Sequence, residues 1–171
     1  NIESICEAWR WTADDHLLLT LPLFHTHGLM VGAHGTLFAG ASAELHRSFD
    51  APRVYDALLG GSYTMFFGVP TMYTRLAASG RVAELGRLRL CVSGSAPLPA
   101  TLHRTIEERG GQRVLERYGM TETIMNVSNP YDGERRPGSV GLPLPEVGVR
   151  LADDGEIQLR GPNVFAGYWQ R

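Results

Sequence analysis

The alternation of short apolar runs with helical patterns is the feature that most constrains the fold of this chain. The apolar runs are almost uninterrupted, as in strands that are buried on both faces of a sheet. The sequence predicts strands at Leu17–Leu21, Ala43–His46, Thr64–Val69, Leu88–Val92 and Arg113–Tyr118. It predicts helices at Gly28–Phe38, Ala51–Gly60, Pro70–Ala78 and Pro99–Arg109. Strands separated by helices favour an α/β fold, in which a parallel sheet is flanked by helices.

The pattern changes near residue 135. Two segments, 149–152 and 156–160, alternate polar and apolar residues, and the Asp-Asp-Gly turn between them is typical of an antiparallel hairpin. We therefore expect residues 1–135 to form the α/β part of the chain. Residues 136–171 are expected to form a crossover and a hairpin that begin a small antiparallel β subdomain.

Both ends of the sequence are typical of an excised segment. Residues 1–11 continue a helical pattern that has no leader before it, and the chain stops at "GYWQR" directly after a predicted strand. We expect the chain to be a piece of a longer protein.

Composition limits the classes of function. The 171 residues are 43% hydrophobic and carry a formal net charge of −2, which gives no electrostatic reason to expect nucleic acid or a membrane surface as partner. No stretch approaches the ~18 consecutive apolar residues of a membrane span. Cys6 and Cys91 lie far apart in apolar surroundings, which favours free thiols and a cytoplasmic location. All 16 basic residues are arginine, so a mechanism that needs lysine cannot be completed within these residues.

Ligands of open parallel sheets bind beyond the carboxyl ends of the strands, so binding and catalytic residues are expected in the loops there. The first is "LPLFHTHG", residues 21–28. Its two histidines resemble one arm of a metal site, but no nearby carboxylate or cysteine completes a ligand set. A pocket-lining His25 is favoured over a metal ligand, and a hydrogen-bonded structural histidine is the alternative.

Two further loops follow the third and fourth predicted strands. In "GVPTMYTRL", Arg75 falls near the ligand edge, where its guanidinium is either solvated or paired with a carboxylate. In "VSGSAPLP", Gly94 lets the backbone approach a flat ligand, and the neighbouring serines offer hydroxyl groups. A serine nucleophile is disfavoured, because no glycine stands two residues after Ser95.

The loop after the fifth predicted strand is "RYGMTETIMN", residues 117–126. Thr121 and Thr123 can donate to phosphate oxygens, and Glu122 is the hard oxygen ligand that Mg²⁺ prefers. Tyr118 presents an aromatic face on which a base can stack. An N-capped turn would have the same residue types, so the pattern alone leaves both interpretations open.

Taken in order, these loops resemble the adenylate-forming superfamily of acyl-CoA synthetases, adenylation domains and luciferases. The resemblance covers about residues 15–171 and rests on six segments in the family's order: "LPLFHTHG", "GVPTMYTRL", "VSGSAPLP", "YGMTET", "GSVGLPLP" and "GEIQLRGPNVFAGYW". It implies an AMP-forming acid–thiol ligase, which activates a carboxylic acid with MgATP as an acyl-adenylate and passes the acyl group to CoA. ATP or AMP, Mg²⁺ and CoA are the implied cofactors and co-substrate.

The resemblance also implies roles by position. Thr121 would contact the α-phosphate, Glu122 would hold Mg²⁺, and His25 would stand where the acyl pocket meets the thiol tunnel. The implied nucleotide-binding residues are Gly94, Ser95, Ala96, Pro97, Tyr118, Gly119, Met120 and Thr121.

Within the superfamily the chain looks most like malonyl-CoA synthetases, on "VPTMYTR" and on "YGMTETIMNVSNPYDGERRPGSVGLPLPEV". A small diacid, malonate or methylmalonate, is therefore the favoured substrate, and Arg75 is the residue expected to pair with its second carboxylate. The implied substrate-binding residues are His25, Arg75, Ser93, Met125 and Ser128. A CoA ligase for another small, fatty or aromatic acid is the first alternative. A non-catalytic module that binds a nucleotide or an acyl-CoA is the second.

Several parts of the family pattern are not found in these residues. They are the Ser/Thr/Gly-rich phosphate loop, the ribose-binding aspartate, the interdomain hinge and the small domain with its catalytic lysine. We expect N-terminal and C-terminal parts of the same enzyme to supply them. The chain alone is expected neither to form an acyl-adenylate nor to transfer an acyl group.

Overall fold

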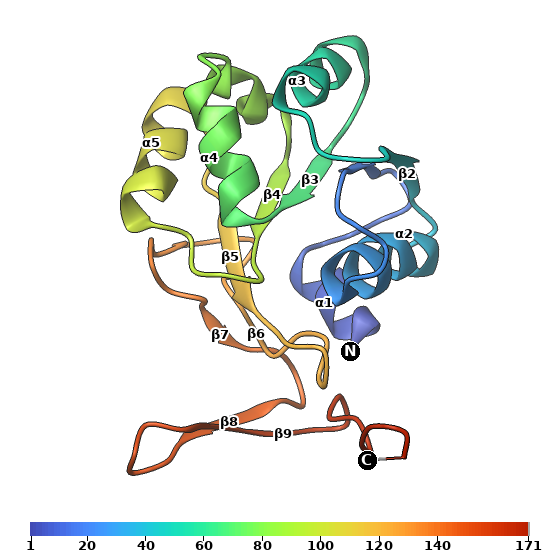
Figure 1. Cartoon of the computed structure of the whole chain (residues 1–171), viewed down its shortest axis with the longest axis vertical. Helices are drawn as coiled ribbons and strands as arrows, with labels where there is room; N and C mark the ends of the chain where they lie inside the picture. Colours follow the sequence, from blue (N-terminus) through green and yellow to red (C-terminus); the bar gives the residue numbers. More distant parts are fainter. Residues whose placement is uncertain (171) are drawn as a thin grey trace.

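Seven strands form one sheet in the computed structural model, which describes residues 1–170 (Figure 1). Their order is β2-β1-β3-β4-β5-β6-β7, with parallel pairing from β2 to β5 and antiparallel pairing of β6 with both neighbours. The strands are β1 (His16–Leu19), β2 (Ser42–Leu45), β3 (Met65–Gly68), β4 (Leu90–Ser93), β5 (Leu115–Tyr118), β6 (Val127–Ser128) and β7 (Leu142–Pro143). The predicted fold class is confirmed.

Helices cover both faces of this sheet. Figure 1 shows α1 and α2 on one side and α3, α4 and α5 on the other. The helices are α1 (Ile2–Ala8), α2 (Gly35–Phe38), α3 (Ala51–Gly60), α4 (Pro70–Ala78) and α5 (Ala100–Gly110), with a π-helix η1 (His27–His34) and a 3₁₀ helix η2 (Val82–Arg87). Asp50 caps α3, because its Oδ1 accepts a hydrogen bond of 3.1 Å from the Arg53 amide.

Two hydrophobic cores follow from the alternation of side chains along the central strands. Leu17, Leu19 and Phe67 point into the core beneath α1, whereas Leu18 and Phe66 point into the core beneath α3 to α5. Strands that bury both faces must be apolar at consecutive positions, which explains the uninterrupted runs in the sequence.

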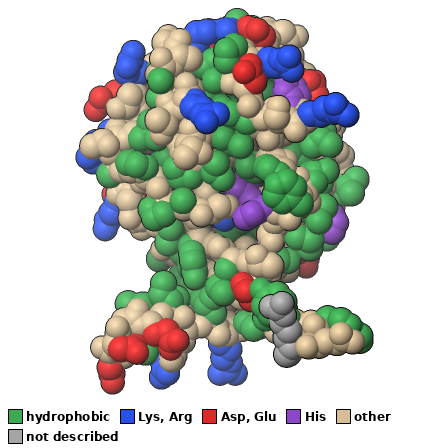
Figure 2. All heavy atoms as spheres, viewed as in Figure 1, with side chains coloured by type: hydrophobic (Ala, Val, Ile, Leu, Met, Phe, Trp, Pro, Cys, Tyr) green, Lys and Arg blue, Asp and Glu red, His purple; other side chains and the backbone are tan. Residues whose placement is uncertain are grey.

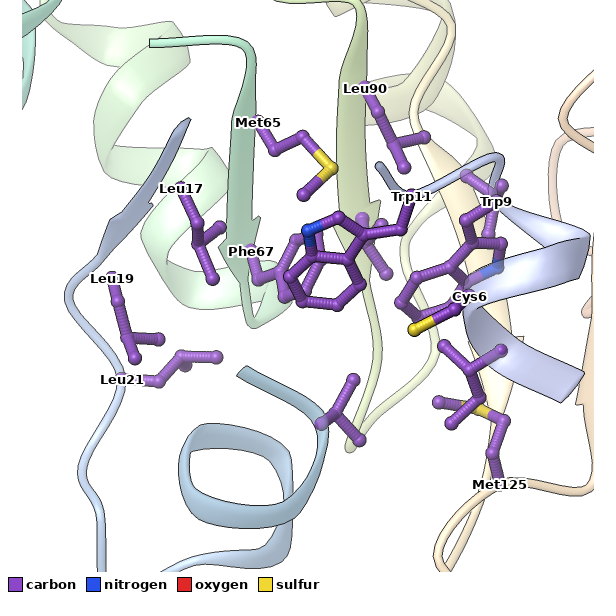
Figure 3. Close-up of a cluster of buried hydrophobic side chains, with 14 of the residues drawn as sticks. Cys6, Trp9, Trp11, Leu17, Leu19, Leu21, Met65, Phe67, Leu90 and Met125 are labelled. Carbon is purple, nitrogen blue, oxygen red and sulfur yellow. The ribbon is translucent and has the colours of Figure 1, made fainter. Parts of the chain in front are cut away.

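The core beneath α1 is built around aromatic side chains (Figure 3). The indoles of Trp9 and Trp11 meet the ring of Phe67 edge-on, with centroid distances of 5.4 and 5.3 Å. Edge-to-face contacts of this kind add to the stabilisation that burial provides. This core fixes α1 against β3, the strand from which the loop before α4 departs.

The predicted helix at residues 28–38 is divided into η1 and α2. Two glycines allow close approach there: a Cβ at Gly32 would lie 2.8 Å from a methyl group of Leu19, and one at Gly35 would lie 2.4 Å from the indole of Trp11. Gly32 of η1 therefore packs against β1, and Gly35 of α2 packs against Trp11; π-helical turns are frequent at functional sites.

The small sheet consists of β8 (Gly148–Leu151) and β9 (Ile157–Arg160), which pair in antiparallel register as predicted. In Figure 1 this hairpin lies apart from the large sheet, close to the C-terminal segment. Within the segment 136–171, whose last residue lies outside the described part of the chain, β7 still belongs to the large sheet. The division at residue 135 stays a prediction. None of the helices that the structure describes has the length and apolar character needed to cross a bilayer.

Candidate active site

Three adjoining cavities lie at the carboxyl ends of β1, β3, β4 and β5. The first has a volume of about 210 Å³, the second about 420 Å³ and the third about 220 Å³. Ser95 lines all three, and His25 lines the first and the third. In Figure 2 histidine atoms are visible in the middle of the molecular face, above the narrow connection to the hairpin. The loops singled out from the sequence therefore meet in space, as their positions after parallel strands predict.

The loop after β1 holds His25 in a tight turn. Its backbone amide donates to the Pro22 carbonyl at 3.3 Å, and its Nδ1 accepts a bond of 3.2 Å from the His27 amide. A Cβ at Gly28 would lie 2.2 Å from the Pro22 oxygen, so only glycine fits there. The exposed His25 ring lies between the first and third cavities.

His27 is the buried member of the His-x-His pair. Its Nδ1 lies 3.5 Å from the Ser95 hydroxyl, and its Nε2 has no hydrogen-bond partner among residues 1–170. Burial, followed by the positive charge of Arg117 and the proximity of His25, holds the pKa of His27 well below its usual value. The imidazole is therefore neutral at neutral pH and lines the first and third cavities as an uncharged polar group.

The loop after β4 forms the wall between the cavities. Ser93 is buried and its hydroxyl has no partner within the described chain, whereas Ser95 is exposed and adopts a left-handed backbone with φ of 67°. Strained conformations of non-glycine residues concentrate at functional sites. Ala96 and Pro97 line the second cavity together with both serines. Gly94 lines none of these three cavities, and its predicted contact with adenine stays a prediction.

The loop after β5 turns back on itself to start β6. The Asn126 amide donates to the Tyr118 carbonyl at 2.9 Å, and a Cβ at Gly119 would lie 2.1 Å from the Ile124 oxygen. Ile124 has a left-handed φ of 62°. The turn presents three predicted site residues to the first cavity: Gly119, Met120 and Thr121. Tyr118 lines the second cavity, which is the largest of the three.

Asn163 lies in the segment after β9 and holds this loop in place. Its role was not predicted from the sequence. Its side-chain amide donates to the Thr123 and Met125 carbonyls at 2.9 and 3.2 Å. Two residues later, the Phe165 amide donates to the Glu122 carbonyl at 2.9 Å. The segment "GEIQLRGPNVFAGYW", one of the six that carry the family resemblance, therefore holds the loop after β5 in place.

Glu122 is the one predicted metal ligand. The Tyr168 hydroxyl donates to its carboxylate, and this bond lowers the pKa of Glu122 below the usual range. No cluster of three or more His, Cys, Asp or Glu side chains suited to a metal occurs among the described residues. A single ionised carboxylate fits Mg²⁺, because this ion commonly takes one or two carboxylates and completes its shell with water and substrate phosphates.

Three predicted substrate-binding residues do not line the cavities. Arg75 is exposed in the last turn of α4, and Met125 is packed into the hydrophobic core beneath α1. Ser128 is engaged in the core, where its hydroxyl accepts a bond of 2.8 Å from the Trp9 indole. Their roles toward a substrate stay predictions.

Arg117 is a site residue that sequence reasoning did not single out. It lies on β5, lines the first and second cavities, and is only 5% exposed. Burial lowers the pKa of its guanidinium to about 10, so the group remains charged at neutral pH. The signal in the sequence was a charged residue inside a strand predicted to be buried.

Comparison with known proteins agrees with this geometry. The sequence matches the family described as AMP-binding enzyme over residues 1–169. Malonate–CoA ligase of Arabidopsis thaliana is 36% identical, over 99% of this chain and 32% of the relative. Indoleacetate–CoA ligase of Aromatoleum aromaticum is 38% identical, over 92% of this chain and 34% of the relative.

The fold comparison leads to the same family. The crystal structure of ATP-bound MatB from Rhodopseudomonas palustris superposes with a TM-score of 0.92 at 45% identity, over 99% of this chain and 36% of that one. The chain thus spans about a third of the length of the curated relatives that it matches. The order of the loops, their convergence at one edge of the sheet and both comparisons confirm the predicted resemblance: the chain belongs to the AMP-binding enzyme family.

Proposed function

We propose that the chain is part of an AMP-forming acid–CoA ligase that activates malonate or methylmalonate. The observation that carries this proposal is the meeting of three cavities at Ser95, one for each of the three substrates of such a ligase. The malonate–CoA ligase of Arabidopsis thaliana, which the chain matches over almost its whole length, supports the choice of acid.

The second cavity is the proposed nucleotide site. Its volume of about 420 Å³ is the largest of the three, and its wall combines Ala96 and Pro97 with the aromatic ring of Tyr118. A base lies flat between an apolar wall and an aromatic face in many nucleotide sites. The α-phosphate then points toward the first cavity, where Thr121 offers a hydroxyl donor.

The first cavity is the proposed site of reaction. The carboxylate of the acid attacks the α-phosphorus there, so that an acyl-adenylate forms and pyrophosphate leaves. Thr121 donates to the phosphate oxygens on which negative charge increases, as a fixed hydrogen-bond donor does in electrostatic catalysis. Glu122 would hold Mg²⁺, and the ion when bound would neutralise phosphate charge.

The third cavity is the proposed path of the CoA thiol. It is lined mainly by apolar groups, including Leu21, Phe24 and Met72. His25 lies between this cavity and the first, where the thiol meets the acyl-adenylate. An apolar passage excludes water from the activated acyl group and so limits its hydrolysis.

The test uses the full-length protein that contains this chain. Thioester formation and pyrophosphate release are measured with ATP, CoA and one acid at a time: malonate, methylmalonate, acetate, butyrate, benzoate and indoleacetate. We expect the highest kcat/KM with malonate or methylmalonate. A higher value with an aromatic or fatty acid would leave the ligase class intact and assign it another acid.

A non-catalytic binding module is the candidate of another class. It predicts calorimetric binding of AMP or an acyl-CoA by the full-length protein without pyrophosphate release with any of these acids. The 171-residue chain by itself is expected to be inactive, since it contains no lysine. Malonate-dependent pyrophosphate release by the isolated chain would contradict that expectation.

A further inference from the structure

An arginine-lined pocket lies at the amino edge of the sheet, opposite the three cavities of the candidate active site. Arg89 directly precedes β4, and Arg113 precedes β5 by two residues. Together with Arg135 they form the charged wall of this pocket, whose volume is about 290 Å³. We propose that the arginine pocket binds a phosphate-bearing anion, at a site separate from the candidate active site. This inference goes beyond the proposed function and does not depend on it.

The first observation is that one aromatic ring brings three guanidinium groups together. Those of Arg10, Arg89 and Arg135 lie 5.5, 5.2 and 5.6 Å from the centroid of the Tyr131 ring. The negative face of an aromatic ring attracts cations, but at partly exposed sites each contact contributes only about 0.5–1 kcal/mol. Tyr131 therefore holds positive charges close together without neutralising them.

The second observation is that positive charge is in excess around the pocket. Ion pairs neutralise two of the four arginines there: Arg10 through Asp132, and Arg89 through Asp15. Neither Arg113 nor Arg135 forms an ion pair with a carboxylate of residues 1–170. The residues that line the pocket include no Asp or Glu. Two positive charges of the wall thus remain uncompensated within the described chain.

The third observation is that Arg135 is fixed by neutral groups. It is only 8% exposed, and its Nε and Nη2 donate to the carbonyls of Pro130 and Tyr131 at 3.1 and 2.7 Å. Its Nη1 donates to the Arg113 carbonyl at 2.6 Å. A guanidinium has five N–H groups, so these three bonds position the side chain and leave donors for a ligand. Carbonyl oxygens carry no full charge and do not neutralise it.

Arg113 brings a second charge to the same wall. Its side chain is exposed, and its Nη1 donates to the Gly133 carbonyl at 3.1 Å. Burial and then the charge of Arg113 hold the pKa of Arg135 below its usual value, which shows that the two guanidinium groups repel each other. An anion bound between them would offset this repulsion.

Phosphate suits this wall better than a carboxylate does. A phosphate monoester carries a charge of about −1.5 to −2 at neutral pH, close to the two uncompensated charges, whereas a carboxylate carries one. Guanidinium groups bind phosphate oxygens through paired, charge-assisted hydrogen bonds. The volume of about 290 Å³ is several times the ~30 Å³ that a water molecule occupies in the liquid, so phosphate and pyrophosphate both fit.

The experiment measures the binding of inorganic phosphate and pyrophosphate to the full-length protein by calorimetry, with AMP present at saturation to fill a nucleotide site. We expect one anion to bind per chain with a Kd below about 1 mM. Arg113→Gln should weaken binding by roughly tenfold or more, because it removes a charged donor. Arg113 is the residue to replace, since its side chain is exposed, whereas Arg135 also binds three backbone carbonyls.

Arg104→Gln, which removes an exposed arginine from α5 outside the pocket, is the matched control and should change the Kd by less than about twofold. Three results would overturn the inference. They are the lack of binding tighter than about 1 mM, equal affinities of the unaltered protein and Arg113→Gln, and binding of acetate as tight as that of phosphate. Each leaves the proposed function standing, since that function is tested by pyrophosphate release.

A measurement on the unaltered protein keeps the inference testable if Arg113→Gln does not fold. Amide hydrogen exchange reports where a bound anion suppresses local opening of the chain. With AMP at saturation, we expect pyrophosphate to slow exchange in residues 129–136, which include Tyr131 and Arg135. Slower exchange confined to residues 117–126 would place the anion at the candidate active site and contradict the inference.

Discussion

Arg89, just before β4, and Arg117, within the neighbouring strand β5, have opposite surroundings. Arg89 precedes β4 at the amino edge, and its Nε donates to the Asp15 carboxylate at 2.6 Å. Its Nη1 donates to the Trp9 carbonyl at 3.1 Å, and the guanidinium lies over the ring of Tyr131 at 5.2 Å. Arg117 is the last residue but one of β5, near the carboxyl edge, and its Nε and Nη2 have no partner in the described chain.

The difference separates an arginine that is paired within the fold from one whose buried Nε and Nη2 have no partner among residues 1–170. Burial alone would raise the pKa of Asp15, but hydrogen bonds from Arg89, Thr12 and Thr64 bring it below the usual value. The Arg89–Asp15 pair is therefore complete before any ligand binds. Arg117 has the cost of burial, and no ion pair within residues 1–170 offsets it.

Arg89→Met should give the largest loss of stability, because it leaves the Asp15 carboxylate, 3% exposed, without its charged partner. We expect the free energy of unfolding to fall by about 3 kcal/mol, as for other broken buried pairs. Urea denaturation of the intact protein measures it. Adding Asp15→Leu should restore part of the loss, and a loss below about 1 kcal/mol would contradict the structural interpretation of Arg89.

Gly94→Ala should give the next largest loss. The new methyl group would overlap the guanidinium of Arg117, and overpacking of this kind costs about 2 kcal/mol. The control is a double-mutant cycle with Arg117→Met, in which the same methyl group meets a more adaptable side chain. Equal costs of Gly94→Ala in both backgrounds would show that the two residues are not coupled.

Much of this arrangement could be predicted from the sequence. The bounds of α3 and α4 agree with the structure, because both helices follow clear turn and proline signals. The five parallel strands were predicted within two residues at every end, since burial on both faces demands uninterrupted apolar runs. The strands β6 and β7 were missed, because two residues each are too few to show a period.

The contrast between the two arginines could not be predicted. Both stand in apolar segments, "RLRL" and "VLERY", and nothing local distinguishes them. Arg89 finds its carboxylate 74 residues away in the sequence, and the lack of a partner for Arg117 is likewise visible only in three dimensions. The order of the loops along the sequence predicted where the candidate site lies. Which charged side chains are paired depends on contacts between distant segments and could not be predicted in this way.

Arg117→Met should change stability by less than about 1 kcal/mol and can increase it, since replacing a buried charge by an apolar side chain is often neutral or favourable. The same substitution at Arg89 is the matched comparison, and the two variants are expected to differ by about 2 kcal/mol or more. Thermal and urea unfolding without ligands measure both. A loss at Arg117 as large as that at Arg89 would show that an unseen partner pairs with it.

The smallest expected effect is a change in the titration of His27. Burial, then the Arg117 charge and His25, lower its pKa in the folded protein, so the folded state binds fewer protons than the unfolded state below about pH 6.5. Stability linked to His27 is therefore complete above that pH and is lost as the pH falls toward the folded pKa. Arg117→Met removes the second cause and should raise the pKa of His27 partway, as measured by NMR of the imidazole nitrogens. The acid-linked loss should shrink accordingly, and an unchanged pKa would mean that the guanidinium charge does not reach this ring.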